Sequence, residues 1–112
     1  MPVPEVAVAR VRRFCAGRVP PEALHQVRLE VEVYPSAITI VERRAPWRPE
    51  YGPEWSRFPI ARLRWSASTK RWTLWWRDRN LRFHRYDGVD PSPWVEPLLE
   101  EVDLDPTCIF WG

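Results

Sequence analysis

Apolar and polar residues alternate through the middle of the chain, over residues 58–86. Alternation with a period of two is typical of β-strands, and turns at residues 66–70 and 78–80 divide this segment into three runs. We therefore predict a three-stranded antiparallel meander. The side chains expected on its core face are Ala61, Leu63, Trp65, Trp72, Leu74, Trp76, Leu81 and Phe83. Those expected on the opposite face are Arg62, Arg64, Arg71, Thr73, Trp75, Arg77, Arg82, His84 and Tyr86.

Two further strands are predicted in the first half of the chain. Residues 27–34 alternate between apolar and charged side chains, and residues 37–43 return after a turn at Pro35 and Ser36. The sequence does not decide which side chains of the second strand face the core, because the alternative that buries its isoleucines also buries Glu42. The two candidate sets are Ile38 with Ile40, and Ala37 with Thr39 and Val41.

One helix is predicted before these strands and another after them. Residues 4–16 place apolar side chains on one face, and Pro4 suits the first turn of a helix. Residues 92–102 follow the same pattern, with Ser92 as the expected N-cap. The fold class is therefore α+β. We expect a single domain over residues 1–112, with a roughly five-stranded, mostly antiparallel sheet and an N-terminal and a C-terminal helix.

The longest connection, residues 44–59, contains four Pro and one Gly. Because proline lacks a backbone N–H, we expect neither a helix nor a central strand in this segment. Trp47, Tyr51 and Trp55 are its aromatic residues. We expect them to hold an ordered loop against the sheet.

Length and composition set further limits. A chain of 112 residues with 45% apolar residues can bury one hydrophobic core. No wholly apolar stretch approaches the length of a membrane span, and no apolar block follows the arginines near the N-terminus. We therefore expect a cytoplasmic protein without a membrane partner. In a reducing compartment Cys15 and Cys108 are expected to be free thiols, and a disulfide between them is the alternative.

Charge is strongly segregated along the chain, although the formal net charge is only +2. Residues 57–86 contain nine Lys and Arg against one acid, Asp78. Residues 87–112 contain seven acids and no Lys or Arg. Two arrangements are consistent with this pattern: either the acidic C-terminal segment covers and neutralises the basic sheet face, or that face stays open to solvent.

Several motifs resemble those of a bacterial family called domain of unknown function 3024, and the resemblance covers essentially the whole chain. These motifs are Trp47 with Arg48 and Pro49, Pro59 with Ala61, Trp72 to Trp76, His84 to Tyr86, and Phe110 to Gly112. Cys108 departs from the pattern, since Gly is expected there. The resemblance implies a stand-alone bacterial domain, and it implies no activity, cofactor or catalytic residue.

The sequence contains no motif for metal binding or catalysis. The candidate ligands His25, His84, Cys15 and Cys108 are all more than five residues apart, whereas structural zinc sites pair their ligands at short spacing. Four scattered glycines do not build a phosphate-binding loop. We therefore predict no catalytic residues, no metal and no organic cofactor. An enzyme of an unrecognised type is the remaining alternative.

The basic and aromatic face of the predicted meander is the strongest functional feature. Proteins that bind single strands combine cations for phosphates with aromatic rings that stack on bases. We therefore expect a non-enzymatic module that binds single-stranded RNA or DNA. The expected binding residues are Arg62, Arg64, Arg71, Trp75, Arg77, Arg82, His84 and Tyr86. The alternative is a protein-interaction or oligomerisation domain, which would engage a protein partner or a second copy of the chain.

Overall fold

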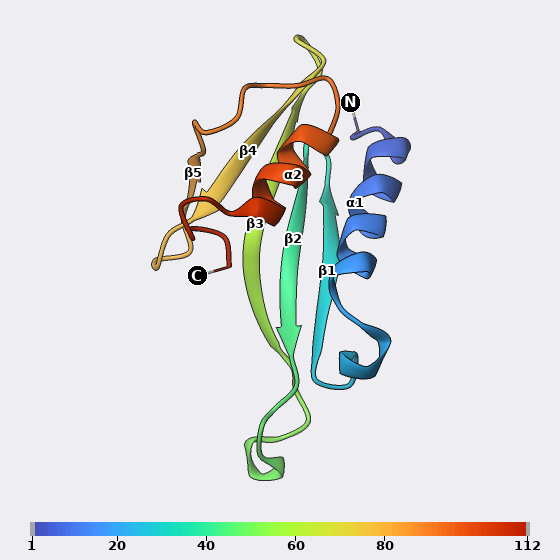
Figure 1. Ribbon diagram of the computed structural model, residues 1–112, viewed down its shortest axis with the longest axis vertical. Helices are drawn as coiled ribbons and strands as arrows, with labels where there is room; N and C mark the ends of the chain where they lie inside the picture. The colour runs from blue at the N-terminus through green and yellow to red at the C-terminus, as the bar shows by residue number, and fades with distance from the viewer. Residues whose placement is uncertain (1, 112) are drawn as a thin grey trace.

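The computed structural model describes residues 2–111, and its strands form one antiparallel sheet (Figure 1). The strands neighbour one another in chain order: β1 (Val27–Tyr34), β2 (Ala37–Arg44), β3 (Ser56–Ser66), β4 (Arg71–Arg77) and β5 (Phe83–Arg85). The helices are α1 (Glu5–Arg18) and α2 (Glu96–Leu104), with short 3₁₀ turns η1 (Pro21–Ala23) and η2 (Pro49–Tyr51). The predicted α+β fold, a five-stranded antiparallel sheet with an N-terminal and a C-terminal helix, is confirmed.

Both helices pack on the same face of the sheet, which we call the helix face (Figure 1). The core lies between the two layers. Its most deeply buried apolar side chains are Val11 of α1, Leu98 and Val102 of α2, Ile38 and Ile40 of β2, Leu63 of β3, and Trp72 and Leu74 of β4. Each large apolar side chain buried in this way contributes about 1.5–3 kcal/mol to stability. The apolar period of each element therefore decides which of its sides faces the core.

Strand β2 is buried on both faces, which resolves the choice left open by its sequence. Ile38 and Ile40 point to the helix face and join the core. Thr39 and Val41 point to the opposite face, because neighbouring residues of a strand alternate, yet both are 0% exposed. Glu42 is half-buried near the end of the strand.

Residues 56–59 were predicted as part of the long loop, but they form the start of β3. Pro59 fits in this strand because the pairing of β2 with β3 shifts register between Ile40 and Val41, opposite Pro59. Proline occurs in sheets mainly at such irregularities, where its missing N–H leaves no ladder bond unmade. The connection between β2 and β3 is therefore shorter than predicted.

The second helix begins at Glu96, so Ser92 is not its N-cap. Ser92 instead continues the sheet beside β4. The N–H of Trp72 donates to the carbonyl of Ser92 at 2.6 Å, and the N–H of Ser92 donates back at 3.0 Å. The Ser92 hydroxyl accepts a bond from the backbone N–H of Trp94 at 3.0 Å.

The side chains of β5 face the opposite sides of the sheet from those predicted. A turn that contains Leu81 with a φ of 64° joins β4 to β5. The pairing that follows places His84 opposite Trp76 and Arg85 opposite Trp75. Directly paired residues point to the same side of a sheet, so His84 lies on the helix face and Arg85 on the other. A register change of one residue reverses every side chain of a strand in this way.

Candidate binding surface

The sheet face opposite the helices, which we call the open face, carries no helix of the described chain (Figure 1). All five strands contribute charged or aromatic side chains to it. These are Arg28, Glu30, Glu32 and Tyr34 of β1, Arg43 of β2, Arg57, Arg62 and Arg64 of β3, Arg71, Trp75 and Arg77 of β4, and Phe83 and Arg85 of β5. Eight arginines thus stand against two glutamates, and the surface is strongly basic.

Aromatic rings and guanidinium groups stack on one another across this face. The Arg64 guanidinium carbon lies 3.8 Å from the ring centroid of Trp75. The Arg62 guanidinium carbon lies 4.1 Å from the ring centroid of Phe83 and 5.3 Å from that of Tyr34. Each cation–π contact of this kind contributes about 0.5–1 kcal/mol at an exposed site, and more where water is excluded. The stacking holds the charged groups close to the sheet.

Two hydrogen bonds to threonine hydroxyls fix the orientation of this layer. The Nε of Arg62 donates to the Oγ1 of Thr39 at 2.9 Å. The indole N–H of Trp75 donates to the Oγ1 of Thr73 at 2.9 Å. Burial lowers the pKa of Arg62 from its ordinary value, but a guanidinium group stays protonated in proteins. The centre of the open face is therefore ordered and positively charged.

The two glutamates of the open face are both paired with arginines. Glu32 accepts hydrogen bonds from Arg57, one of them at 2.7 Å from its Nε, and these bonds are the main reason why the pKa of Glu32 is lowered. Glu30 lies 3.5 Å from an Nη1 of Arg43. Six further arginines of the face form no salt bridge within residues 2–111: Arg28, Arg62, Arg64, Arg71, Arg77 and Arg85. Their positive charge is available to an anion.

The alternation predicted for β3 and β4 is confirmed. It places five of the predicted binding residues on the open face: Arg62, Arg64, Arg71, Trp75 and Arg77. Arg77 is the least available, because its Nε donates to the carbonyl of Pro59 at 2.7 Å and its Nη1 to that of Asp78 at 2.9 Å. Arg82 is exposed in the turn before β5.

The prediction that His84 and Tyr86 share the open face is wrong, because of the register of β5. The ring of His84 stacks on Trp76, with 4.8 Å between centroids, and its Nε2 lies 2.6 Å from a carboxylate oxygen of Asp78. That bond lowers the pKa of Asp78. Tyr86 is 6% exposed, and its hydroxyl donates to Glu101 at 2.8 Å. Burial raises the pKa of Tyr86. Neither ring can stack on a ligand of the open face.

Eight open-face residues were not among the predicted binding residues, and Tyr34, Phe83 and Arg85 are the three of them that lie nearest its stacked rings or its exposed arginines. Phe83 was expected in the core, and Arg85 was assigned to neither face. The register of β5 places both on the open face. Tyr34 could have been found, because the alternation of residues 27–34 already places it on the same side as Glu30 and Glu32.

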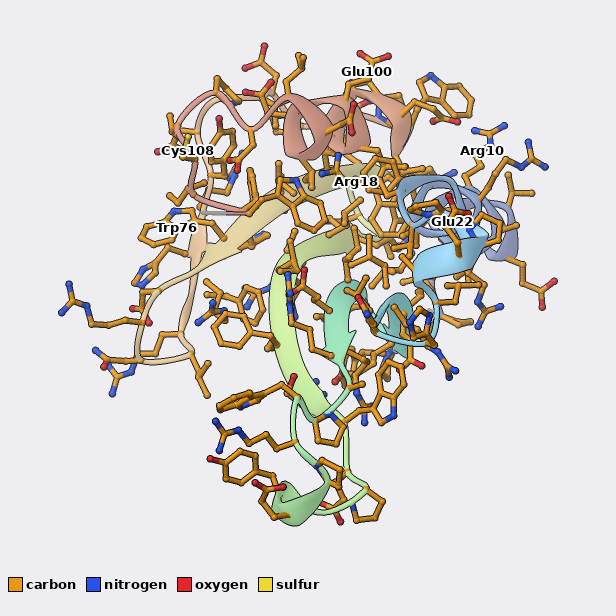
Figure 2. The ribbon with its side chains drawn as sticks, turned by 60° about the horizontal axis from the view of Figure 1, so that its bottom comes forward. Arg10, Arg18, Glu22, Trp76, Glu100 and Cys108 are labelled. Atoms are coloured by element: carbon orange, nitrogen blue, oxygen red, sulfur yellow. The ribbon has the colours of Figure 1, made fainter. Side chains whose placement is uncertain are left out.

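The acidic C-terminal segment does not cover the basic face, so this alternative is wrong. Helix α2 lies on the helix face, and two of its acidic side chains pair with α1 instead. Glu96 lies 2.8 Å from Arg10, and Asp103 forms a salt bridge with Arg18. Figure 2 shows Arg10 and Arg18 where the two helices meet. The positive charge of the open face is therefore not neutralised by the C-terminal acids.

The thiols and the potential metal ligands do not form a second site. Cys15 of α1 is buried, and burial raises its pKa to about 12. Cys108 is exposed, and both cysteines are free thiols. Within residues 2–111 no three side chains of His, Cys, Asp or Glu gather closely enough to hold a metal ion. The open face is thus the main concentration of functional groups.

Comparison with known proteins identifies the family. The family model described as domain of unknown function, DUF3024, matches residues 1–112. The chain belongs to this family. No curated protein and no solved structure matches the DUF3024 chain. Neither helix within residues 2–111 of this DUF3024 domain has the length and apolar character needed to cross a bilayer.

Proposed function

We propose that the open face binds single-stranded RNA or DNA in the cytoplasm. The observation that carries this proposal is the distribution of charge between the two faces. Glu96 and Asp103 of α2 pair with α1. Six arginines of the open face have no salt bridge within residues 2–111, and they lie beside stacked aromatic rings. Single-strand binders use the same combination of a basic surface and accessible π-faces.

The arginines are assigned two different roles. Arg71 and Arg85 have no salt bridge within the described chain and stand exposed on neighbouring strands, so we assign them contacts with phosphates. Arg64 lies over the ring of Trp75, with its guanidinium carbon 3.8 Å from the ring centroid. The pair presents a planar, partly exposed platform on which a base can stack, because both guanidinium planes and indole rings stack on bases.

The test compares two variants with the same loss of charge. Arg71→Gln with Arg85→Gln removes two positive charges from the open face. Arg12→Gln with Arg13→Gln removes two from exposed positions on α1, in the other layer. Binding of a fluorescein-labelled poly(dT) or poly(rU) oligonucleotide is measured by anisotropy over a series of salt concentrations. The logarithm of the binding constant should fall linearly with the logarithm of salt concentration, with a slope of about −0.7 for each phosphate contact.

We expect the open-face double variant to reduce the steepness of this slope by roughly 1.4, since two contacts are lost. The α1 double variant should keep the slope of the unmodified protein. Trp75→Leu should weaken binding by roughly 5-fold to 100-fold with little change in slope, because stacking contributes about 1–3 kcal/mol per base. Absence of binding at low salt, or equal losses in both double variants, would refute the proposal.

A second candidate, a protein-interaction or self-association domain, is favoured by the free edge of β1. This strand is paired on one side only. A cavity of about 610 Å³ lies between its edge and α1, lined by Cys15, Val19, Leu29 and Val31 among others. Unpaired strand edges recruit further strands. Light scattering on nuclease-treated protein distinguishes the two candidates, because nucleic-acid carry-over disappears with nuclease while a true oligomer keeps its mass.

A further inference from the structure

The connection between β2 and β3, residues 45–55, extends beyond the end of the sheet (Figures 1 and 2). We call it the tip loop. It contains Pro46, Pro49 and Pro53 and the short η2 turn. Proline fixes φ near −65° and reduces the freedom of the backbone. The tip loop is therefore a stiff projection at one end of the long axis of the molecule.

Two aromatic side chains of the tip loop are exposed, which corrects the expectation that they pack on the sheet. Trp47 is 74% exposed and Tyr51 is 60% exposed. Their ring centroids lie 5.5 Å apart, and the planes are tilted by 43°. The Arg48 guanidinium carbon lies 4.4 Å from the Trp47 centroid. The loop thus presents adjacent π-faces to solvent on a stiff backbone.

These rings border a hollow that continues toward the open face. A cavity of about 1060 Å³ is lined by Trp47, Tyr51, Trp55 and neighbouring residues of the loop and of β2 and β3. Trp55 also borders a smaller cavity of about 180 Å³, together with Arg28 and Arg43 of the open face. The Arg28 guanidinium carbon lies 4.6 Å from the Trp55 ring centroid. Trp55 therefore joins the tip loop to the basic surface.

The charges of this end of the molecule are largely balanced. Arg44 pairs with Glu42 at 2.8 Å, and Arg48 pairs with Glu50 at 3.7 Å. Glu54 adds a further negative charge. A polyanion held on the open face gains little electrostatic attraction here, so the contribution of the tip loop must come from its rings.

We propose that Trp47 and Tyr51 form a second stacking site for bases of the same single strand, beyond the end of the sheet. This inference rests on the proposed function. A strand bound across the open face reaches Trp55 and then the tip loop, where bases stack on the exposed rings. The tip loop is thus an extension that only a longer oligonucleotide can reach.

The test uses oligonucleotides of about 6 and about 20 nucleotides, within and beyond the range of site sizes of small single-strand binders. The loop variant is Trp47→Ala with Tyr51→Ala. Trp94→Ala is the matched control, because Trp94 is also an exposed indole, at 60%, but precedes α2 in the other layer. Thermal unfolding confirms that each variant is folded, and Trp47→Phe with Tyr51→Phe should restore binding because it keeps both rings.

We expect the loop variant to bind the long oligonucleotide roughly 5-fold to 100-fold more weakly, with an unchanged salt slope and an unchanged affinity for the short one. The control should behave like the unmodified protein. If the unmodified protein binds neither oligonucleotide, the proposed function itself fails. If it binds both and the loop variant matches it, or if the variant changes the salt slope, only the second stacking site is refuted.

Discussion

Asp105 holds the C-terminal segment in place, and its replacement tests how the fold is closed. One carboxylate oxygen accepts hydrogen bonds from the backbone N–H groups of Ile109 and Phe110, at 2.9 and 3.1 Å. The other accepts one from the N–H of Trp111 at 2.9 Å. This arrangement sets the ring of Phe110 against Tyr86, with 5.2 Å between centroids. We predict that Asp105→Ala loosens the whole segment.

The expected loss follows from the number of bonds. A hydrogen bond contributes a net amount of about 1 kcal/mol, and more when the acceptor is charged. Three lost bonds to part-buried N–H groups therefore cost about 3 kcal/mol, which lowers the melting temperature by roughly 10 °C in a domain of this size. Asp105→Asn keeps one carbonyl oxygen and tolerates the left-handed backbone at this position, where φ is 43°. It should cost only about 1 kcal/mol.

Urea unfolding followed by tryptophan fluorescence measures both values, and the slope of free energy against urea should stay the same. Asp103→Ala is the matched control, because it removes a neighbouring carboxylate whose salt bridge with Arg18 is partly solvent-exposed. Such a pair contributes about 0–1 kcal/mol. If Asp105→Ala costs no more than Asp103→Ala, the three hydrogen bonds do not anchor the segment and the reasoning is wrong.

Three further predictions concern stability. Burial raises the pKa of Cys15 to about 12. Above about pH 9 the thiol of the unfolded chain therefore loses its proton while the buried thiol keeps it, and the free energy of unfolding falls by about 1.4 kcal/mol per pH unit. Urea unfolding at a series of pH values should show that Cys15→Ala lacks this pH-dependent loss of stability. A Cβ on Gly88 would lie 2.5 Å from the ring of Tyr86, whereas one on Gly17 meets nothing within 4 Å. Gly88→Ala should therefore lower the free energy of unfolding by about 1–3 kcal/mol and Gly17→Ala should not lower it, and equal effects would contradict this. Cys108 has a φ of 57°, so Cys108→Gly should raise the free energy of unfolding by about 0.5–1 kcal/mol, and a loss in the same urea assay would argue against strain there.

The strands and helices could be predicted because the apolar residues that recur with the period of each element are the ones that face the core. The alternation of β3 and β4 placed Arg64 and Trp75 on one face, where the structure also has them. The face of β5 could not be predicted in this way. Its register depends on a turn in which Leu81 adopts a left-handed conformation that only glycine adopts readily, so the sequence carries no signal for it.

The position of the acidic segment shows why charge patterning alone is a weak guide to tertiary structure. Seven acids following a basic sheet suggested that the two attract one another. The structure packs Leu98, Leu99 and Val102 of α2 into the core on the other side. Burial of each apolar side chain contributes about 1.5–3 kcal/mol, and an exposed ion pair contributes about 0–1 kcal/mol. The apolar stripe of the helix therefore decides its position.

Thr39 and Val41 are fully shielded on the open face, where residues 2–111 place no second layer of backbone. Over Thr39 the shield includes Arg62, whose Nε donates to the Thr39 hydroxyl and whose guanidinium group lies over the rings of Tyr34 and Phe83. Long side chains commonly cover apolar surface with their methylene groups while their charged ends stay in water. Residues 2–111 thus form two layers only, and the side chains that cover the open face must be both bulky and hydrophilic. Shorter side chains at these positions would let water reach Thr39 and Val41, whereas neutral side chains of equal length would still exclude it.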